Sequence, residues 1–131
     1  MGVHHRCARF TSSIAILAGL FSSPSLSATE YDSVKEHMDQ LVQNNPGIVE
    51  HVILGSNSRN QSIYGIKIHQ SNGPITTKQL VVGAHHGNEQ LSTTVALSFA
   101  DQITEIMKTG NASTHGFEGM EFHVFPVLNI P

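Results

Sequence analysis

The sequence predicts an α/β fold built on a mixed sheet. Short apolar runs alternate with longer amphipathic segments, and the connections between the runs differ in length. A short polar turn joins the first two runs, which indicates an antiparallel hairpin. A helical segment joins the last two runs, which indicates a right-handed parallel crossover.

The first half of the chain predicts a helix followed by the hairpin. Apolar residues recur on one helical face over residues 30–45, and Thr29 is a candidate N-cap. The hairpin strands are expected at residues 48–54 and 62–69, because polar turn residues separate two apolar runs.

The second half predicts a strand, a helix and a strand. Residues 78–84 end in a continuous apolar run, which is typical of a strand covered on both faces. An amphipathic helix is expected over residues 89–108 and a fourth strand over residues 120–128. We expect an unpaired apolar edge after Leu128, where the sheet would be interrupted.

Residues 1–28 have the order of a secretory signal peptide. Arg6 and Arg9 precede the apolar run 12–21, and small polar residues follow, so we expect cleavage after Ala28. The run is shorter than the roughly 20 residues that span a bilayer. The sequence therefore predicts a secreted or periplasmic protein without a transmembrane span in its mature part.

The composition argues against a nucleic-acid-binding protein and against one that is stabilised by disulfides. Lys and Arg number 7 against 10 Asp and Glu, and both leader arginines would be removed, so a nucleic acid is not the expected partner. The single cysteine, Cys7, also lies in the leader. The mature part cannot form a disulfide and depends on its core, or on a metal.

A candidate metal site follows the third predicted strand. His86 and Glu89 are three residues apart, directly after the apolar run 80–84, and both can reach one ion. Neutral imidazole and carboxylate are ligands that catalytic Zn²⁺ accepts. Glu89 would begin the following helix, where the helix dipole favours an ionised carboxylate. His85 has only Asn88 at the same spacing.

The residues alone leave other roles for the histidines open. A bare His-x-x-Glu is common by chance, so His85 and His86 could be ordinary loop residues. His123 lies in an apolar strand and is expected to be a hydrogen-bonded sheet residue rather than a ligand. The remaining histidines of the mature part are expected at the surface or in turns: His37, His51, His69 and His115.

Four segments, in the same order, resemble the zinc carboxypeptidase family, which includes carboxypeptidases A, B and E. They are the opening helix 31–41, the stretch 46–68 with its Pro-Gly-Ile-Val and Ile-Tyr-Gly-Ile-Lys-Ile runs, the segment 82–89, and the Phe-Pro-Val-Leu-Asn run 125–129. His86 and Glu89 match the two ligands of the family's first zinc motif.

This resemblance implies the phosphorylase/hydrolase-like zinc exopeptidase fold. That fold is a mixed sheet with helices on both faces, truncated here after the fourth strand. Residues 29–131 would be the N-terminal portion of the catalytic domain. The implied function is that of a zinc-dependent metallocarboxypeptidase acting on the C-termini of peptides or proteins.

The resemblance also implies which groups are missing. After Asn129 the family's Pro-Asp-Gly is replaced by Ile130-Pro131. The third zinc ligand, the arginine that polarises the carbonyl and the general base are expected beyond Pro131, so this chain contains no catalytic residue and is expected to be inactive alone. Two alternatives are a zinc deacylase like aspartoacylase or succinylglutamate desuccinylase, which shares His-Gly-Asn-Glu, and a non-catalytic truncated protein.

Overall fold

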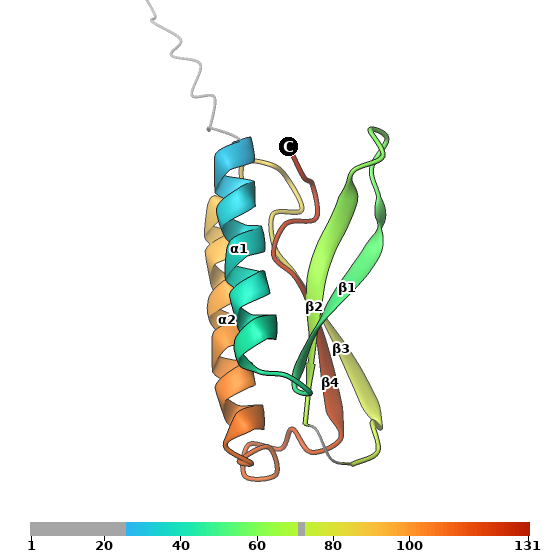
Figure 1. Cartoon of the computed structure of the whole chain (residues 1–131), viewed down its shortest axis with the longest axis vertical. Helices are drawn as coiled ribbons and strands as arrows, with labels where there is room; N and C mark the ends of the chain where they lie inside the picture. Colours follow the sequence, from blue (N-terminus) through green and yellow to red (C-terminus); the bar gives the residue numbers. More distant parts are fainter. Residues whose placement is uncertain (1–25, 71–72) are drawn as a thin grey trace, which may run out of the picture.

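The computed structural model describes residues 26–70 and 73–131, so most of the predicted leader lies outside the described residues. Its elements, in chain order, are α1 (Ala28–Asn44), β1 (Val49–Ser56), β2 (Ser62–His69), β3 (Thr77–Val82), α2 (Gln90–Lys108) and β4 (Met120–Phe125) (Figure 1). Each helix and strand expected from the sequence is therefore present. Within the described part of the chain, no helix combines the length and hydropathy needed to cross a membrane.

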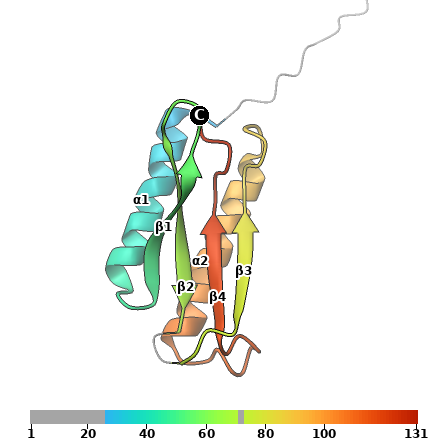
Figure 2. The ribbon, with the colours of Figure 1, turned by 90° about the vertical axis from the view of Figure 1, so that its right-hand side faces the viewer.

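The four strands form one mixed sheet in the order β1-β2-β4-β3 (Figure 2). β1 pairs antiparallel with β2, and β3 runs parallel to β4, as predicted. β4 also pairs antiparallel with β2, so it lies inside the sheet. The expectation of a free edge after Leu128 is wrong, because β4 inserts between β2 and β3. The free edges of the described sheet are β1 and β3.

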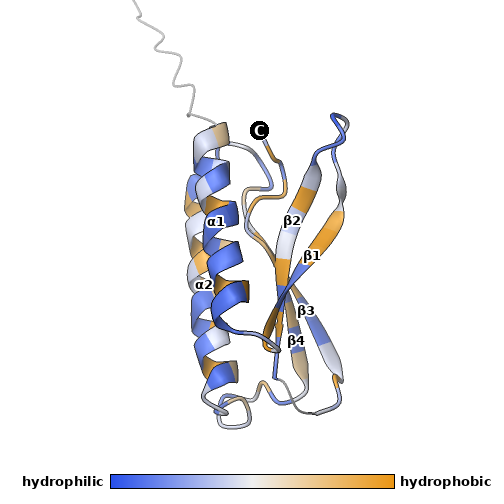
Figure 3. Cartoon of the chain, in the orientation of Figure 1, coloured by the Kyte–Doolittle hydropathy of each residue, from blue (hydrophilic) through white to orange (hydrophobic). Residues whose placement is uncertain are grey.

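Both helices of the described residues lie against the same face of the sheet (Figure 1). The core between the layers includes Met38 of α1, Ala100 of α2, and Ile66, Ile68 and Val124 of the sheet. Figure 3 shows apolar residues along the strands and mainly hydrophilic residues over the visible side of α1.

The opposite face of the sheet carries no helix from the described residues. Leu80 is 63% exposed and Val82 is 43% exposed on this face, so β3 is not covered on both sides as its apolar run predicted. The expected second helical layer is thus not supplied by these residues. The mixed sheet is confirmed, and its helical covering is one-sided over the part of the chain described.

Several element ends differ from the predictions for local reasons. The N-cap of α1 is Ser27 rather than Thr29, because Ser27 and Glu30 form a capping box. β3 ends at Val82 rather than at residue 84, since Ala84 has a φ of 39° and leaves the extended region. β4 ends at Phe125 rather than at residue 128, because Pro126 has no N–H to continue the ladder.

Candidate metal centre

The candidate site lies in the loop between β3 and α2, beyond the carboxyl ends of the two parallel strands. Backbone hydrogen bonds from Leu128 N to Gly83 O (3.2 Å) and from Asn129 N to Ala84 O (3.1 Å) hold the segment after β4 beside this loop. Figure 2 shows β3 and β4 pointing to the same end of the sheet. Sites in open α/β sheets gather at this edge.

Backbone packing and one hydroxyl group fix the start of the loop. A Cβ atom on Gly83 would lie 2.5 Å from Pro126 O and 2.7 Å from Ser92 O, so only glycine fits there. The Ala84 N–H donates to Ser92 Oγ at 2.7 Å, and that hydroxyl donates to Glu89 O at 2.7 Å. Ser92 therefore links the two ends of the loop, at Ala84 and at Glu89, and we call this pair of hydrogen bonds the Ser92 brace.

His86 and Glu89, the two predicted ligands, are joined across one turn. The His86 N–H donates to Glu89 Oε2 at 3.2 Å, and the Glu89 N–H donates to His86 O at 3.1 Å. Glu89 is the N-cap of α2, yet its side chain does not cap the helix. The carboxylate instead turns back to the loop, on the side of His86. His86 is exposed and Glu89 is half-buried.

His85 differs from His86 in its relation to Glu89. The two rings meet edge to face with centroids 5.1 Å apart. The hydrogen bond to the Glu89 carboxylate comes from His86, not from His85. This contact involves the main chain of His86 and not its ring, so the choice of His86 over His85 as a ligand stays a prediction.

The donor chemistry of this pair fits zinc, but the pair is incomplete. One imidazole and one carboxylate on a braced loop are suitable ligands, and a catalytic zinc site usually takes three protein ligands. Over residues 26–70 and 73–131, no group of three or more His, Cys, Asp or Glu side chains could hold a metal ion. Among the described residues, His86 and Glu89 therefore stay the predicted ligands, and no third candidate lies beside them.

The other histidines have partners away from this loop. His123 Nε2 lies 2.6 Å from Glu121 Oε1 on the outer face of the sheet, which confirms the expectation of a hydrogen-bonded sheet histidine. His37, His51 and His69 pair with Asp101, Asp39 and Glu50, at 2.8, 3.2 and 3.3 Å. The exposed His115 stacks on Phe117.

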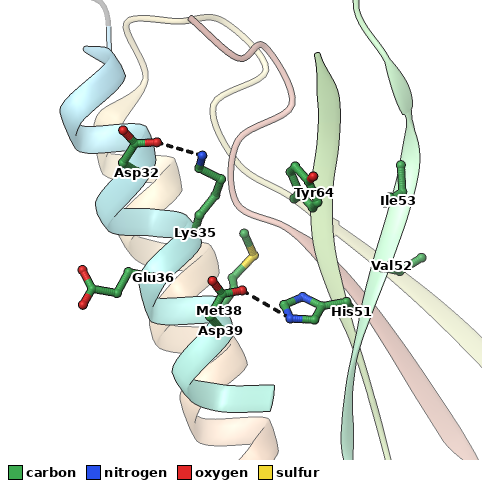
Figure 4. A pocket seen from close by; sticks show the side chains of 9 residues that line it. All are labelled: Asp32, Lys35, Glu36, Met38, Asp39, His51, Val52, Ile53 and Tyr64. Carbon is green, nitrogen blue, oxygen red and sulfur yellow. Dashed lines mark ion pairs between the residues drawn. The ribbon is translucent and has the colours of Figure 1, made fainter. Parts of the chain in front are cut away.

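Of two hollows on the described structure, one adjoins the loop and the other does not. The larger, of about 970 Å³, lies between α1 and the hairpin β1–β2 and is lined by groups including Asp39, His51 and Tyr64 (Figure 4). Neither His86 nor Glu89 lines it. A second hollow of about 540 Å³ lies along β3 and the first turns of α2, with Glu89 and the exposed Leu91 in its lining.

Sequence reasoning missed Ser92 and Glu121. A serine in the first turn of a helix looks like any polar surface residue, so its bridging role has no signal in the sequence. Glu121 is buried, with its carboxylate 3.1 Å from Lys78 Nζ. The period-two spacing of Glu121 and His123 could have indicated that both lie on one face of the strand.

The sequence matches the family model described as "Zinc carboxypeptidase" over residues 34–130. The chain belongs to the zinc carboxypeptidase family. The match includes the loop with His86 and Glu89. No curated protein matches the chain in sequence.

Solved structures support the fold of this zinc carboxypeptidase family member. A crystal structure of thrombin activatable fibrinolysis inhibitor matches with a TM-score of 0.60 and 18% identity, over 84% of this chain and 29% of that one. The bovine protein, in complex with tick carboxypeptidase inhibitor, matches with a TM-score of 0.56 and 18% identity, over 76% of this chain and 30% of that one. This chain thus spans less than a third of the length of either.

Proposed function

We propose that this chain supplies the first two zinc ligands, His86 and Glu89, of a metallocarboxypeptidase that hydrolyses C-terminal peptide bonds. The observation that carries the proposal is the closed turn between these two residues, at the carboxyl end of β3 and inside the segment that matches the family. The family match also favours a peptidase over the aspartoacylase-like deacylase.

The bound zinc ion would polarise the scissile carbonyl and lower the pKa of its bound water toward roughly 7. The neutral imidazole of His86 and the ionised carboxylate of Glu89 offer lone pairs for ligation. The Ser92 brace keeps the loop in one arrangement, so little ordering remains when the ligands engage.

Glu89 is not the general base in this proposal. Its carboxylate is committed to ligation and to the His86 N–H, so it is a poor acceptor for the proton of the attacking water. A separate carboxylate must accept that proton and pass it to the leaving amine as the C–N bond breaks. We assign this group, the third ligand and the carbonyl-polarising arginine to sequence beyond Pro131, and residues 1–131 alone are inactive in this account.

We further propose that the chain acts outside the cytoplasm. The basic, apolar and small-residue order of its N-terminus supports export to a secreted or periplasmic location. The substrates would be peptides or proteins with a free C-terminal carboxylate.

Hydrolysis assays on two chains test the proposed function. A chain extended beyond Pro131 with the family's remaining segment should release C-terminal residues from peptides with a free carboxylate, and not from peptides with an amidated C-terminus. Residues 1–131 should release none. Cleavage of N-acyl amino acids but not of peptides by the extended chain would transfer the assignment to the deacylase class.

A further inference from the structure

The residues just before α1 contact the candidate metal loop. The Leu26 N–H donates to Gly87 O at 2.7 Å, and Gly87 lies between His86 and Glu89. The Leu26 side chain is 6% exposed and belongs to the hydrophobic core. The core thus anchors the donor that holds the middle of the loop.

Ser27 joins the same contact to the first turn of α1. Its N–H donates to Glu30 Oε2 at 2.7 Å, and its hydroxyl accepts from the Glu30 N–H at 3.3 Å. Gln90 Nε2, in the first turn of α2, donates to Glu30 Oε1 at 3.4 Å. The start of α1 is therefore linked to both the loop and the start of α2.

We propose that Leu26 and Ser27 belong to the folded domain and position the loop that carries His86 and Glu89, so that processing of the leader leaves both residues in place. The sequence alone suggested cleavage after Ala28, which would remove them. That cut would delete the N-cap and place a charged α-amino group at the positive end of the helix dipole.

That this loop binds zinc rests on the proposed function. The retention of Leu26 and Ser27 after processing, and their effect on the order of the loop, do not. Leu26 and Ser27 act on the site through the backbone at Gly87. They are positioning residues and touch no reacting atom.

The first experiment is the intact mass of the protein recovered after export from cells expressing the full chain. The expected N-terminus lies at Leu26 or earlier, and an unprocessed chain also retains both residues. A start at Ser27 or any later residue would overturn the proposal.

The second experiment measures amide hydrogen exchange of the loop in the metal-free full chain. In Leu26→Ala and Ser27→Ala, the Glu89 N–H should exchange about three- to tenfold faster, as expected when a hydrogen bond is weakened. The matched control is Met38→Ala, which removes a 2%-exposed core side chain of α1 and should lower global stability without this local change. If Leu26→Ala fails to fold, Ser27→Ala and the rescue variant Ser27→Thr carry the test.

The outcomes separate the two proposals. Unchanged loop exchange in Ser27→Ala, or an equal change in Met38→Ala, would overturn the positioning role. Because this measurement is made without metal, faster exchange in a chain that binds no zinc would support the positioning role and count against the proposed function alone.

Discussion

The backbone N–H of His86 donates a hydrogen bond to the carboxylate of Glu89 at 3.2 Å. This contact turns the carboxylate away from the helix it would otherwise cap and toward the loop. The backbone of His86 and the carboxylate of Glu89 are thus held together within one turn of the loop.

Glu89→Gln should separate ligation from folding. The amide oxygen of glutamine can still accept the His86 N–H, so the free energy of unfolding should change by no more than about 1 kcal/mol. A neutral amide is a much poorer zinc ligand, so the zinc affinity of the extended chain should fall by more than the roughly 10–100-fold typical of outer-shell changes. Urea unfolding and zinc titration measure the two effects. An unchanged zinc affinity would remove Glu89 from the ligand set.

Ser92→Ala should loosen the metal loop. The change deletes a hydroxyl that accepts from Ala84 N–H and donates to Glu89 O, so it should cost about 1–3 kcal/mol of unfolding free energy. The control is Ser98→Ala, on an exposed position of the same helix, which should change stability by less than about 0.5 kcal/mol. Equal effects of the two variants in chemical denaturation would show that Ser92 is not a brace.

Gly83→Ala should destabilise the end of β3. The new Cβ would meet the backbone oxygens of Pro126 and Ser92, which cannot move without shifting their segments, so we expect a loss of about 1–3 kcal/mol. Gly55→Ala in β1 is the matched control, because a Cβ there meets nothing within 4 Å. Thermal unfolding of the two variants gives the comparison, and a neutral Gly83→Ala would contradict the packing described.

Glu121 should make the stability of the domain depend on acid pH. Burial acts to raise the pKa of its carboxyl, but the hydrogen bonds from His123 and Lys78 outweigh burial and hold the pKa below its usual value of 4.5. A carboxyl with a lowered folded-state pKa stabilises the fold above its unfolded-state pKa, and this stability is lost as the pH falls through the folded-state value.

Denaturation of wild type and Glu121→Gln at a series of pH values between about 6 and about 3 tests this dependence. The wild type should lose stability over this interval, and Glu121→Gln should lose less of it. Glu118→Gln, at an exposed carboxyl without an ion pair among the described residues, is the control. The same acid dependence in wild type and Glu121→Gln would show that another group is responsible.

The sequence predicted the helices and strands, and the position of the candidate loop after β3, because those features are local. Strand β2 has the predicted bounds, since its alternating apolar residues end at clear turns. The hairpin follows from the short connection, and the closeness of His86 and Glu89 follows from their spacing in one turn.

The features that escaped prediction depend on tertiary contacts or on an ambiguous pattern. The small residues Ser27 and Ala28 suit both a cleavage site and a helix start, so the predicted N-cap, Thr29, lies two residues too late. The one-sided helical layer could not be foreseen, because an apolar run such as 80–84 does not specify which elements of the chain pack on each face of the strand. Similarly, nothing local indicates that the Leu26 N–H reaches Gly87.

The most direct test of the account is a zinc titration of the chain, followed by NMR of its histidine side chains. A chain without residues 1–25 is used, because His4 and His5 of the predicted leader could otherwise bind the metal. We predict that the ring signals of His86 shift with zinc, and that His86→Ala and Glu89→Ala weaken zinc binding whereas His85→Ala does not. Zinc binding that is unchanged in His86→Ala and Glu89→Ala, or that is lost only in His85→Ala, would contradict it.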